Sequence, residues 1–199
     1  MSHTSKALVA GLLVAIAASC ASTKVISSWK EPSAGPLKFK KVLVLVLSKD
    51  ESVRRAAEDE VVRQVRKTQA VPSYSLFLAD DLRDTDRAKA KITQDGFDGA
   101  IVMRLVDKSQ ETTWVPGSYP APYYSMYGYW GYGYGMAYDP GYVRTDTIVK
   151  IETNIYSVQD GKLLWSGLSE SFNPTGPREL VEGVAGAVVE ELKKQGLIQ

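Results

Sequence analysis

Residues 42–47 have the sequence VLVLVL, a continuous apolar run that lies between Lys40-Lys41 and Ser48-Lys49-Asp50. An apolar run without polar alternation is typical of a strand that is covered on both of its faces. We therefore expect this run to form the central strand of a sheet, and the neighbouring segments can be placed relative to it.

The segments that follow the run alternate between helix and strand. Asp50 or Ser52 is placed to cap a helix that continues to about residue 68, because apolar residues recur at four-residue steps from Val53 to Val65. Pro72 interrupts the pattern, and beyond it we expect a short strand at 74–77, a more polar helix at 80–94 and an apolar strand at 100–106. This order predicts an α/β sandwich with crossover connections.

The last third of the chain has a different period. Apolar and polar residues alternate from Thr145 to Ile155, which indicates a half-exposed strand, and Asp160-Gly161 supplies a hairpin turn into an antiparallel partner at 163–165. A wide apolar face then predicts a closing helix at about 178–195, with Gly196 as its C-cap. The predicted fold class is α/β: a mixed sheet with a strand-helix-strand-helix start, an antiparallel hairpin and a C-terminal amphipathic helix packed on the sheet.

Three of these segments carry a resemblance to a known family. They are Ile151–Gly167 (IETNIYSVQDGKLLWSG), Glu170–Pro174 (ESFNP) and the closing helix with its end Lys194-Gln195-Gly196-Leu197-Ile198. Together they resemble the DUF4136-type bacterial lipoproteins, a family of uncharacterised function, over most of the mature chain. The resemblance implies a fold and a lipoprotein nature, and it implies nothing about chemistry.

The first twenty residues have the order of a lipoprotein signal peptide. Lys6 gives a positive start, Ala7–Ala18 is apolar, and small residues lead to Ser19 and Cys20. The apolar run has about 12 residues, fewer than the roughly 20 that a membrane-spanning helix needs. Ala17-Ala18-Ser19-Cys20 resembles a lipobox, which implies cleavage between Ser19 and Cys20 and acyl chains, such as palmitate, on Cys20. The alternative is an ordinary secretory leader that leaves Cys20 as a free thiol.

Location and domain organisation follow from this leader. Ala21, in place of an aspartate, favours the outer membrane over the inner one, with the domain lipid-anchored and facing the periplasm. We expect a signal peptide at 1–19, a tether at 20–36, within which Val25-Ile26 and Trp29 are able to form an edge strand, and a single domain at 37–199. About 180 mature residues suit one domain.

Composition excludes several classes of function. The only histidine is His3 and the only cysteine is Cys20, so a mature fold has neither an imidazole nor a thiol with which to build a Ser-His-Asp triad or a zinc site. The formal net charge of +1 gives no field that favours nucleic acid. Asp80, Asp81, Asp84 and Asp86 do not have the spacing of an EF-hand calcium loop, and Asp80 or Asp81 is more simply explained as the N-cap of the following helix. We expect no cofactor and no metal.

The most unusual segment is the insertion at 116–142, PGSYPAPYYSMYGYWGYGYGMAYDPGY, which contains nine of the eleven tyrosines. Its glycines are expected to prevent a stable helix or strand. The aromatic side chains suit contact with a glycan, an envelope protein or the membrane interface; the alternative is a flexible tract without a dedicated ligand. The candidate contact residues are Tyr119, Tyr123, Tyr124, Tyr127, Tyr129, Trp130, Tyr132, Tyr134 and Tyr138.

These observations favour a non-catalytic binding or envelope-maintenance module attached to a membrane. Two other classes stay open: a hydrolase that uses carboxylates alone, and a structural protein that self-associates through the aromatic segment. The sequence leaves the oligomeric state undetermined.

Overall fold

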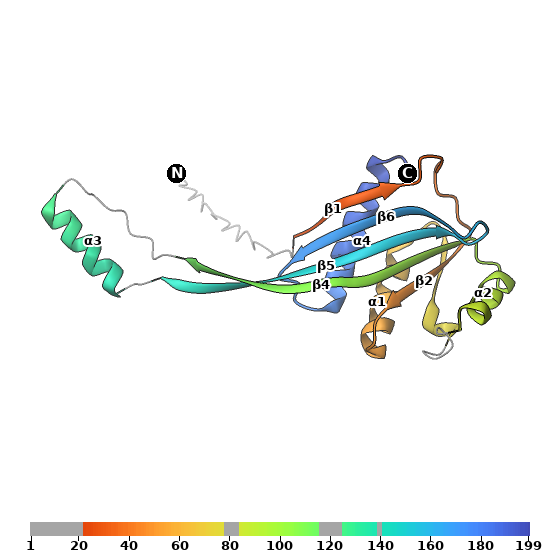
Figure 1. Cartoon of the computed structure of the whole chain (residues 1–199), viewed down its shortest axis with the longest axis horizontal. Coiled ribbons are helices and arrows are strands. Elements are labelled where there is room, and N and C mark those ends of the chain that lie inside the picture. The colour runs from red at the N-terminus through yellow and green to blue at the C-terminus, as the bar shows by residue number, and fades with distance from the viewer. Residues whose placement is uncertain (1–21, 78–83, 116–124, 139–140) are drawn as a thin grey trace, which may run out of the picture.

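A computed structural model describes residues 22–77, 84–115, 125–138 and 141–199 (Figure 1). Six strands form one mixed sheet in the order β1-β6-β5-β4-β2-β3. The strands are β1 (Thr23–Lys30), β2 (Lys41–Leu47), β3 (Gln69–Pro72), β4 (Gly99–Val115), β5 (Tyr142–Ser157) and β6 (Lys162–Phe172). The helices are α1 (Glu51–Gln64), α2 (Thr85–Gln94), α3 (Met126–Tyr138) and α4 (Pro177–Lys194), with a 3-10 turn at Ser73–Ser75.

The first half of the chain forms the parallel part of the sheet. β2 carries the VLVLVL run and pairs in parallel with β3 on one side and with β4 on the other. Val42, Leu43 and Val44 are buried, as expected for a strand covered on both faces. The expected crossover order is confirmed, but β2 lies one strand from the edge, because β4 and β5 take the middle of the sheet.

The second half forms the antiparallel part. β5 and β6 make the expected hairpin, in which Gly161 adopts the positive φ of 62°. β1 then pairs with β6 from Thr23↔Ser171 to Lys30↔Trp165. The segment proposed as a tether at 20–36 is therefore an edge strand over Thr23–Lys30, which is the alternative that Val25-Ile26 and Trp29 indicate.

The core lies on one face of the sheet, under α1 and α4. Its fully buried members include Val44 from β2, Trp165 from β6 and Val184 from α4. On the opposite face, a smaller cluster of Leu43, Phe77 and Phe97 is covered by α2. The rest of that second face, over β1, β6 and β5, carries no described helix (Figure 1).

Three local expectations are wrong. Residues 74–77 are not a strand, because β3 ends at Pro72, which has no N–H to donate, and the chain turns at Ser73–Ser75. The expected helix at 80–94 begins at Thr85 in the described part, where the Asp84 carboxylate accepts a hydrogen bond from the Arg87 N–H. Asp80 and Asp81 lie outside the described residues.

The third correction concerns Glu58. It lies with Asp59 and Glu60 among arginines, and such a charged run predicts solvent-exposed helix surface. The Glu58 side chain is 0% exposed. The carboxylate accepts hydrogen bonds from the backbone N–H of Val46, the hydroxyl of Ser73 and the backbone N–H of Tyr74. Glu58 therefore joins α1 to β2 and to the turn after β3, and these three donors compensate for its burial.

Candidate functional site

β4 and β5 continue well beyond the sheet as a two-stranded ribbon. β5 pairs with β6 only as far as Ile148↔Phe172, whereas its pairing with β4 runs on to Tyr142↔Val115. We call the ribbon of Gln110–Val115 and Tyr142–Thr147, together with α3, the aromatic arm. Figure 1 shows the arm projecting from one end of the sheet with α3 farthest from the body.

The ribbon changes character along its length. Charged side chains occupy its inner and middle rungs, where Arg144 and Asp146 form an ion pair at 2.8 Å. The outer rungs pair Trp114 with Val143 and Val115 with Tyr142. Trp114 is 55% exposed, and Tyr142 and Val143 are similarly exposed. The arm thus presents large apolar side chains to solvent at its outer rungs.

Asn173 fixes the base of the arm. Its side-chain carbonyl accepts a hydrogen bond from the Thr147 N–H at 2.7 Å, and its amide donates to Asp146 at 2.8 Å. The Asn173 backbone N–H also donates to the Thr147 carbonyl. The hydrogen bond from Asn173, followed by those from Arg144, lowers the pKa of the Asp146 carboxyl. The residue adopts a φ of 49°, which asparagine tolerates better than most residues do.

The insertion contains a helix, contrary to the expectation that its glycines would prevent one. Ser125 caps α3, because its hydroxyl accepts a hydrogen bond from the Gly128 N–H and its carbonyl from the Tyr129 N–H. A cap of this kind contributes about 1 kcal/mol and offsets part of the glycine penalty. The flanking strands are longer than the expected 100–106 and 145–155, since their pairing extends to Val115 and starts again at Tyr142.

One face of α3 forms an aromatic surface. Met126, Tyr129, Trp130 and Tyr134 lie at helical spacing around a shallow depression of about 320 Å³. Tyr127 is 80% exposed and Trp130 is 64% exposed. Four of the predicted contact residues, Tyr127, Tyr129, Trp130 and Tyr134, are thereby placed on one exposed helix.

The other predicted site residues are not placed in this way. Tyr132 and Tyr138 belong to α3, but their side chains are outside the description. Ser19, Cys20, Tyr119, Tyr123 and Tyr124 lie outside the described residues.

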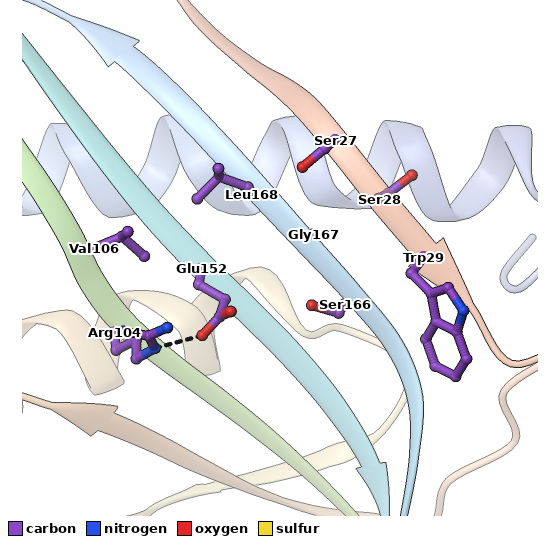
Figure 2. A pocket seen from close by; sticks show the side chains of 9 residues that line it. All are labelled: Ser27, Ser28, Trp29, Arg104, Val106, Glu152, Ser166, Gly167 and Leu168. Atoms are coloured by element: carbon purple, nitrogen blue, oxygen red, sulfur yellow. Dashed lines mark hydrogen bonds and ion pairs between the residues drawn. The ribbon is translucent and has the colours of Figure 1, made fainter.

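A second feature, which the sequence reasoning missed, is the bare face of the sheet. Figure 2 shows side chains from β1, β4, β5 and β6 around a shallow hollow of about 300 Å³. Arg104 and Glu152 form an ion pair at 2.5 Å on its floor, and Trp29 stands at its rim. The polar alternation of β5, which places Lys150, Glu152 and Asn154 on one face, was the available signal.

Charged side chains on this bare face are paired. Glu170 lies between Lys24, at 3.6 Å, and Lys150, at 3.9 Å. The two charged residues that line the hollow, Arg104 and Glu152, are paired with each other.

The described residues can be searched for metal-binding groups and for carboxyls with a shifted pKa. Within the described ranges, no group of three or more His, Cys, Asp or Glu side chains is arranged to hold a metal ion. The pKa shifts of Asp50, Glu51 and Asp146 are all downward, which keeps these carboxyls ionised. No helix in the described part of the chain is both long enough and apolar enough to cross a bilayer.

No family model and no curated protein sequence matches the chain. Several solved structures resemble it. A PelC dodecamer from Paraburkholderia phytofirmans has a TM-score of 0.43 and 10% identity, over 87% of this chain and 99% of that one. Lipoprotein GNA1162 from Neisseria meningitidis has a TM-score of 0.40 and 15% identity, over 78% and 99%. A minor lipoprotein from Acinetobacter baumannii has a TM-score of 0.33 and 9% identity, over 81% and 98%.

Two of these three solved chains are lipoproteins by name, as the sequence resemblance implies for this one. All three TM-scores are below 0.5, so the likeness supports no conclusion about how this chain acts. The narrower resemblance to the DUF4136-type family stays a prediction.

Proposed function

We propose that the chain is a lipoprotein of the outer membrane that faces the periplasm, and that it acts as a non-catalytic binding or envelope-maintenance module through its aromatic arm. The observation that carries the proposal is the exposed α3, which a two-stranded ribbon holds away from the body of the domain. Exposed tyrosine and tryptophan provide rigid contact area and have no role in the core described above.

Anchoring is proposed through Cys20. Several acyl chains, each buried methylene contributing about 0.8 kcal/mol, hold a domain stably at a bilayer. Mass spectrometry of the mature N-terminus tests this: we expect a mass that corresponds to an acylated Cys20, and fractionation with the outer membrane. Cys20→Ser is expected to leave the leader uncleaved. An unmodified Cys20 in the wild-type chain would contradict the anchor.

Binding through the arm is tested by shortening it. Val115 and Tyr142 pair directly, so residues 116–141 can be replaced by an Asn-Gly turn without disturbing the ladder below. We expect the shortened chain to be exported, acylated and as stable as the wild type, but to lose the contacts seen by cross-linking in envelopes. If the cross-linked contacts are unchanged, the proposal is wrong. A change in oligomer size alone would favour self-association through the arm.

A further inference from the structure

The base of the arm and the start of the lipid-proximal strand lie at the same end of the sheet. Thr23, the first residue of β1, pairs with Ser171, which pairs with Val149, which pairs with Lys108. The arm begins two rungs further along β4 and β5, at Gln110↔Thr147. The anchor point and the arm therefore leave the domain from one transverse row of residues.

The lengths of the two connections can be compared. Cys20 precedes Thr23 by three residues, so the lipid-bearing residue lies within about 11 Å of the row. β5 continues from Val149 to Tyr142, which at about 3.3 Å per residue extends the ribbon roughly 23 Å from the same row. The arm is thus about twice as long as the longest link to the lipid. An arm that points toward the anchoring bilayer must enter its interface.

The charge of the arm decreases toward its outer end, and an uncharged outer end is what entry into a membrane interface requires. Residues 125–138 contain no charged side chain, and Asp139 is the one charged residue between Trp114 and Val143 in the sequence. Counted outward from the body, Asp146 stands in the second of the six ribbon rungs and Arg144 in the fourth, so the charged rungs end where the outer apolar rungs begin. Tyrosine and tryptophan concentrate at membrane interfaces, where an amphipathic ring lies between lipid tails and water.

α3 is a weak helix for an aqueous environment. It has 13 residues and four glycines, each of which costs about 1 kcal/mol relative to alanine. Helices of this length are marginal in water, whereas a medium poor in water favours internal backbone hydrogen bonds. Gly131 and Gly133 have open space where a side chain would lie, so close packing within this chain does not explain them.

We propose that the aromatic arm inserts α3 into the interface of the bilayer that holds the Cys20 lipid, so that the protein is attached to one membrane at two points. The inference rests on the lipid anchor of the proposed function. The occupant of the aromatic surface is then phospholipid, at the boundary between headgroups and acyl chains, and the body of the domain is held at a fixed height and orientation.

Tryptophan quenching tests the insertion. Acylated full-length protein is reconstituted into vesicles of phosphatidylcholine that carries bromine near the headgroup end of its chains. Two of the four tryptophans, Trp114 and Trp130, lie in the arm, so quenching is expected to remove up to about half of the emission. Trp130→Phe is expected to remove about half of the quenchable part, which leaves the contribution of Trp114.

Trp29→Phe is the matched control, because Trp29 is also exposed, at 45%, but lies on the bare sheet face. This variant is expected to keep the full quenchable emission. If Trp130→Phe leaves quenching unchanged, or if the wild type is not quenched at all, the arm does not enter lipid and the proposal is overturned. An arm that cross-links to a protein in envelopes without being quenched in vesicles would place a protein partner there instead.

A separate measurement distinguishes failure of the lipid anchor from failure of the insertion. The same vesicles are mixed with the acylated protein and with protein from which the acyl chains have been removed. Quenching of both forms supports insertion whatever modifies Cys20, whereas an unacylated wild-type N-terminus in mass spectrometry contradicts the anchor alone. Because α3 has no basic residue, adding anionic lipid or salt is expected to change the quenching less than twofold. A strong salt dependence would overturn insertion by the aromatic face.

Discussion

β4 and β5 run without interruption through two regions that differ in almost everything except backbone pairing. In the sheet body, Met103 and Ile155 are each 4% exposed and belong to the core cluster that α1 and α4 cover. In the arm, Trp114 and Val143 belong to the same two strands but more than half of each side chain faces solvent. The hydrogen-bonded ladder between β4 and β5 is continuous from the body into the arm. In the arm the strands are therefore held by backbone pairing, without the side-chain burial that the body has.

This difference in burial separates the residues that stabilise the fold from those that are available for contact with other molecules. Side chains of the body are held by neighbours on several elements, so their loss affects the whole fold. Side chains of the arm form an exposed surface, and their loss is expected to affect binding rather than folding. Four experiments can break or sharpen this separation, and they follow in order of expected effect.

The largest effect is expected from tryptophan truncation. Trp165 is fully buried, and its indole N–H donates to the Gln195 side chain at 3.1 Å. Trp165→Ala is expected to reduce the free energy of unfolding by about 3–5 kcal/mol, measured by urea denaturation. Trp114→Ala, in the arm, should change it by less than about 1 kcal/mol. Equal losses from the two variants would show that the arm is part of the core.

Glycine substitution should give opposite signs in the two regions. A Cβ at Gly183 of α4 would lie 2.6 Å from the Thr23 hydroxyl, so Gly183→Ala must push β1 away and is expected to cost about 1–3 kcal/mol. At Gly131 of α3 the space is open, and Gly131→Ala should stabilise the helix by about 1 kcal/mol. Denaturation measures the first change, and circular dichroism the second. A destabilised Gly131→Ala chain would mean that α3 packs on something within the protein.

The boundary itself depends on Asn173. Asn173→Ala removes two side-chain hydrogen bonds and leaves alanine at a positive φ, so we expect a loss of about 2 kcal/mol in the local stability of the arm base. Hydrogen exchange at the Thr147 amide measures this loss. Asn173→Gly keeps the backbone geometry and should lose about half as much. An unchanged exchange rate at the Thr147 amide would show that Asn173 does not stabilise the base of the arm.

The smallest effect is expected from acid. The guanidinium of Arg54, followed by that of Arg55, lowers the pKa of Glu51 in the body from 4.5 to about 2, and Asn173 lowers that of Asp146 in the arm. In both cases the folded state holds the ionised form, so the stabilisation is complete above the unfolded-state pKa. It is lost as pH falls through the folded value, between about 4.5 and 2 for Glu51.

Carboxyl chemical shifts followed by NMR test this pH dependence. Asn173→Ala is expected to return the Asp146 pKa toward its usual value while the Glu51 titration stays the same, which isolates the arm from the body. A shared response of the two carboxyls would contradict their independence.

The sequence predicted the body better than the arm, for a physical reason. VLVLVL is uniformly apolar because the strand is covered on both faces, whereas α1 and α4 have periodic apolar residues because each helix buries one face. From Asp107 to Thr113 the residues are polar on both faces, which by periodicity resembles a loop. They form a strand because they pair with β5. Since β5 is about 40 residues away in the sequence, this pairing cannot be recognised from local periodicity.

Of the candidate site, residue types were predictable and geometry was not. The aromatic composition identified the segment, and four of its named residues lie on α3. The helix was missed because the glycine penalty was counted without the Ser125 cap. Glu58 was misplaced because its three donors come from β2 and from the turn after β3, so its burial depends on tertiary structure rather than on the charged run around it.

The position of β1 has a consequence for how the protein is made. Its sheet partner, β6, follows it by about 140 residues, and β6 is the only strand with which it pairs in the described part of the chain. At synthesis rates of about 5–20 residues per second, β1 waits roughly 7 to 30 seconds for that partner. The first strand to be synthesised thus pairs with the last one, and its edge stays unpaired until β6 is present.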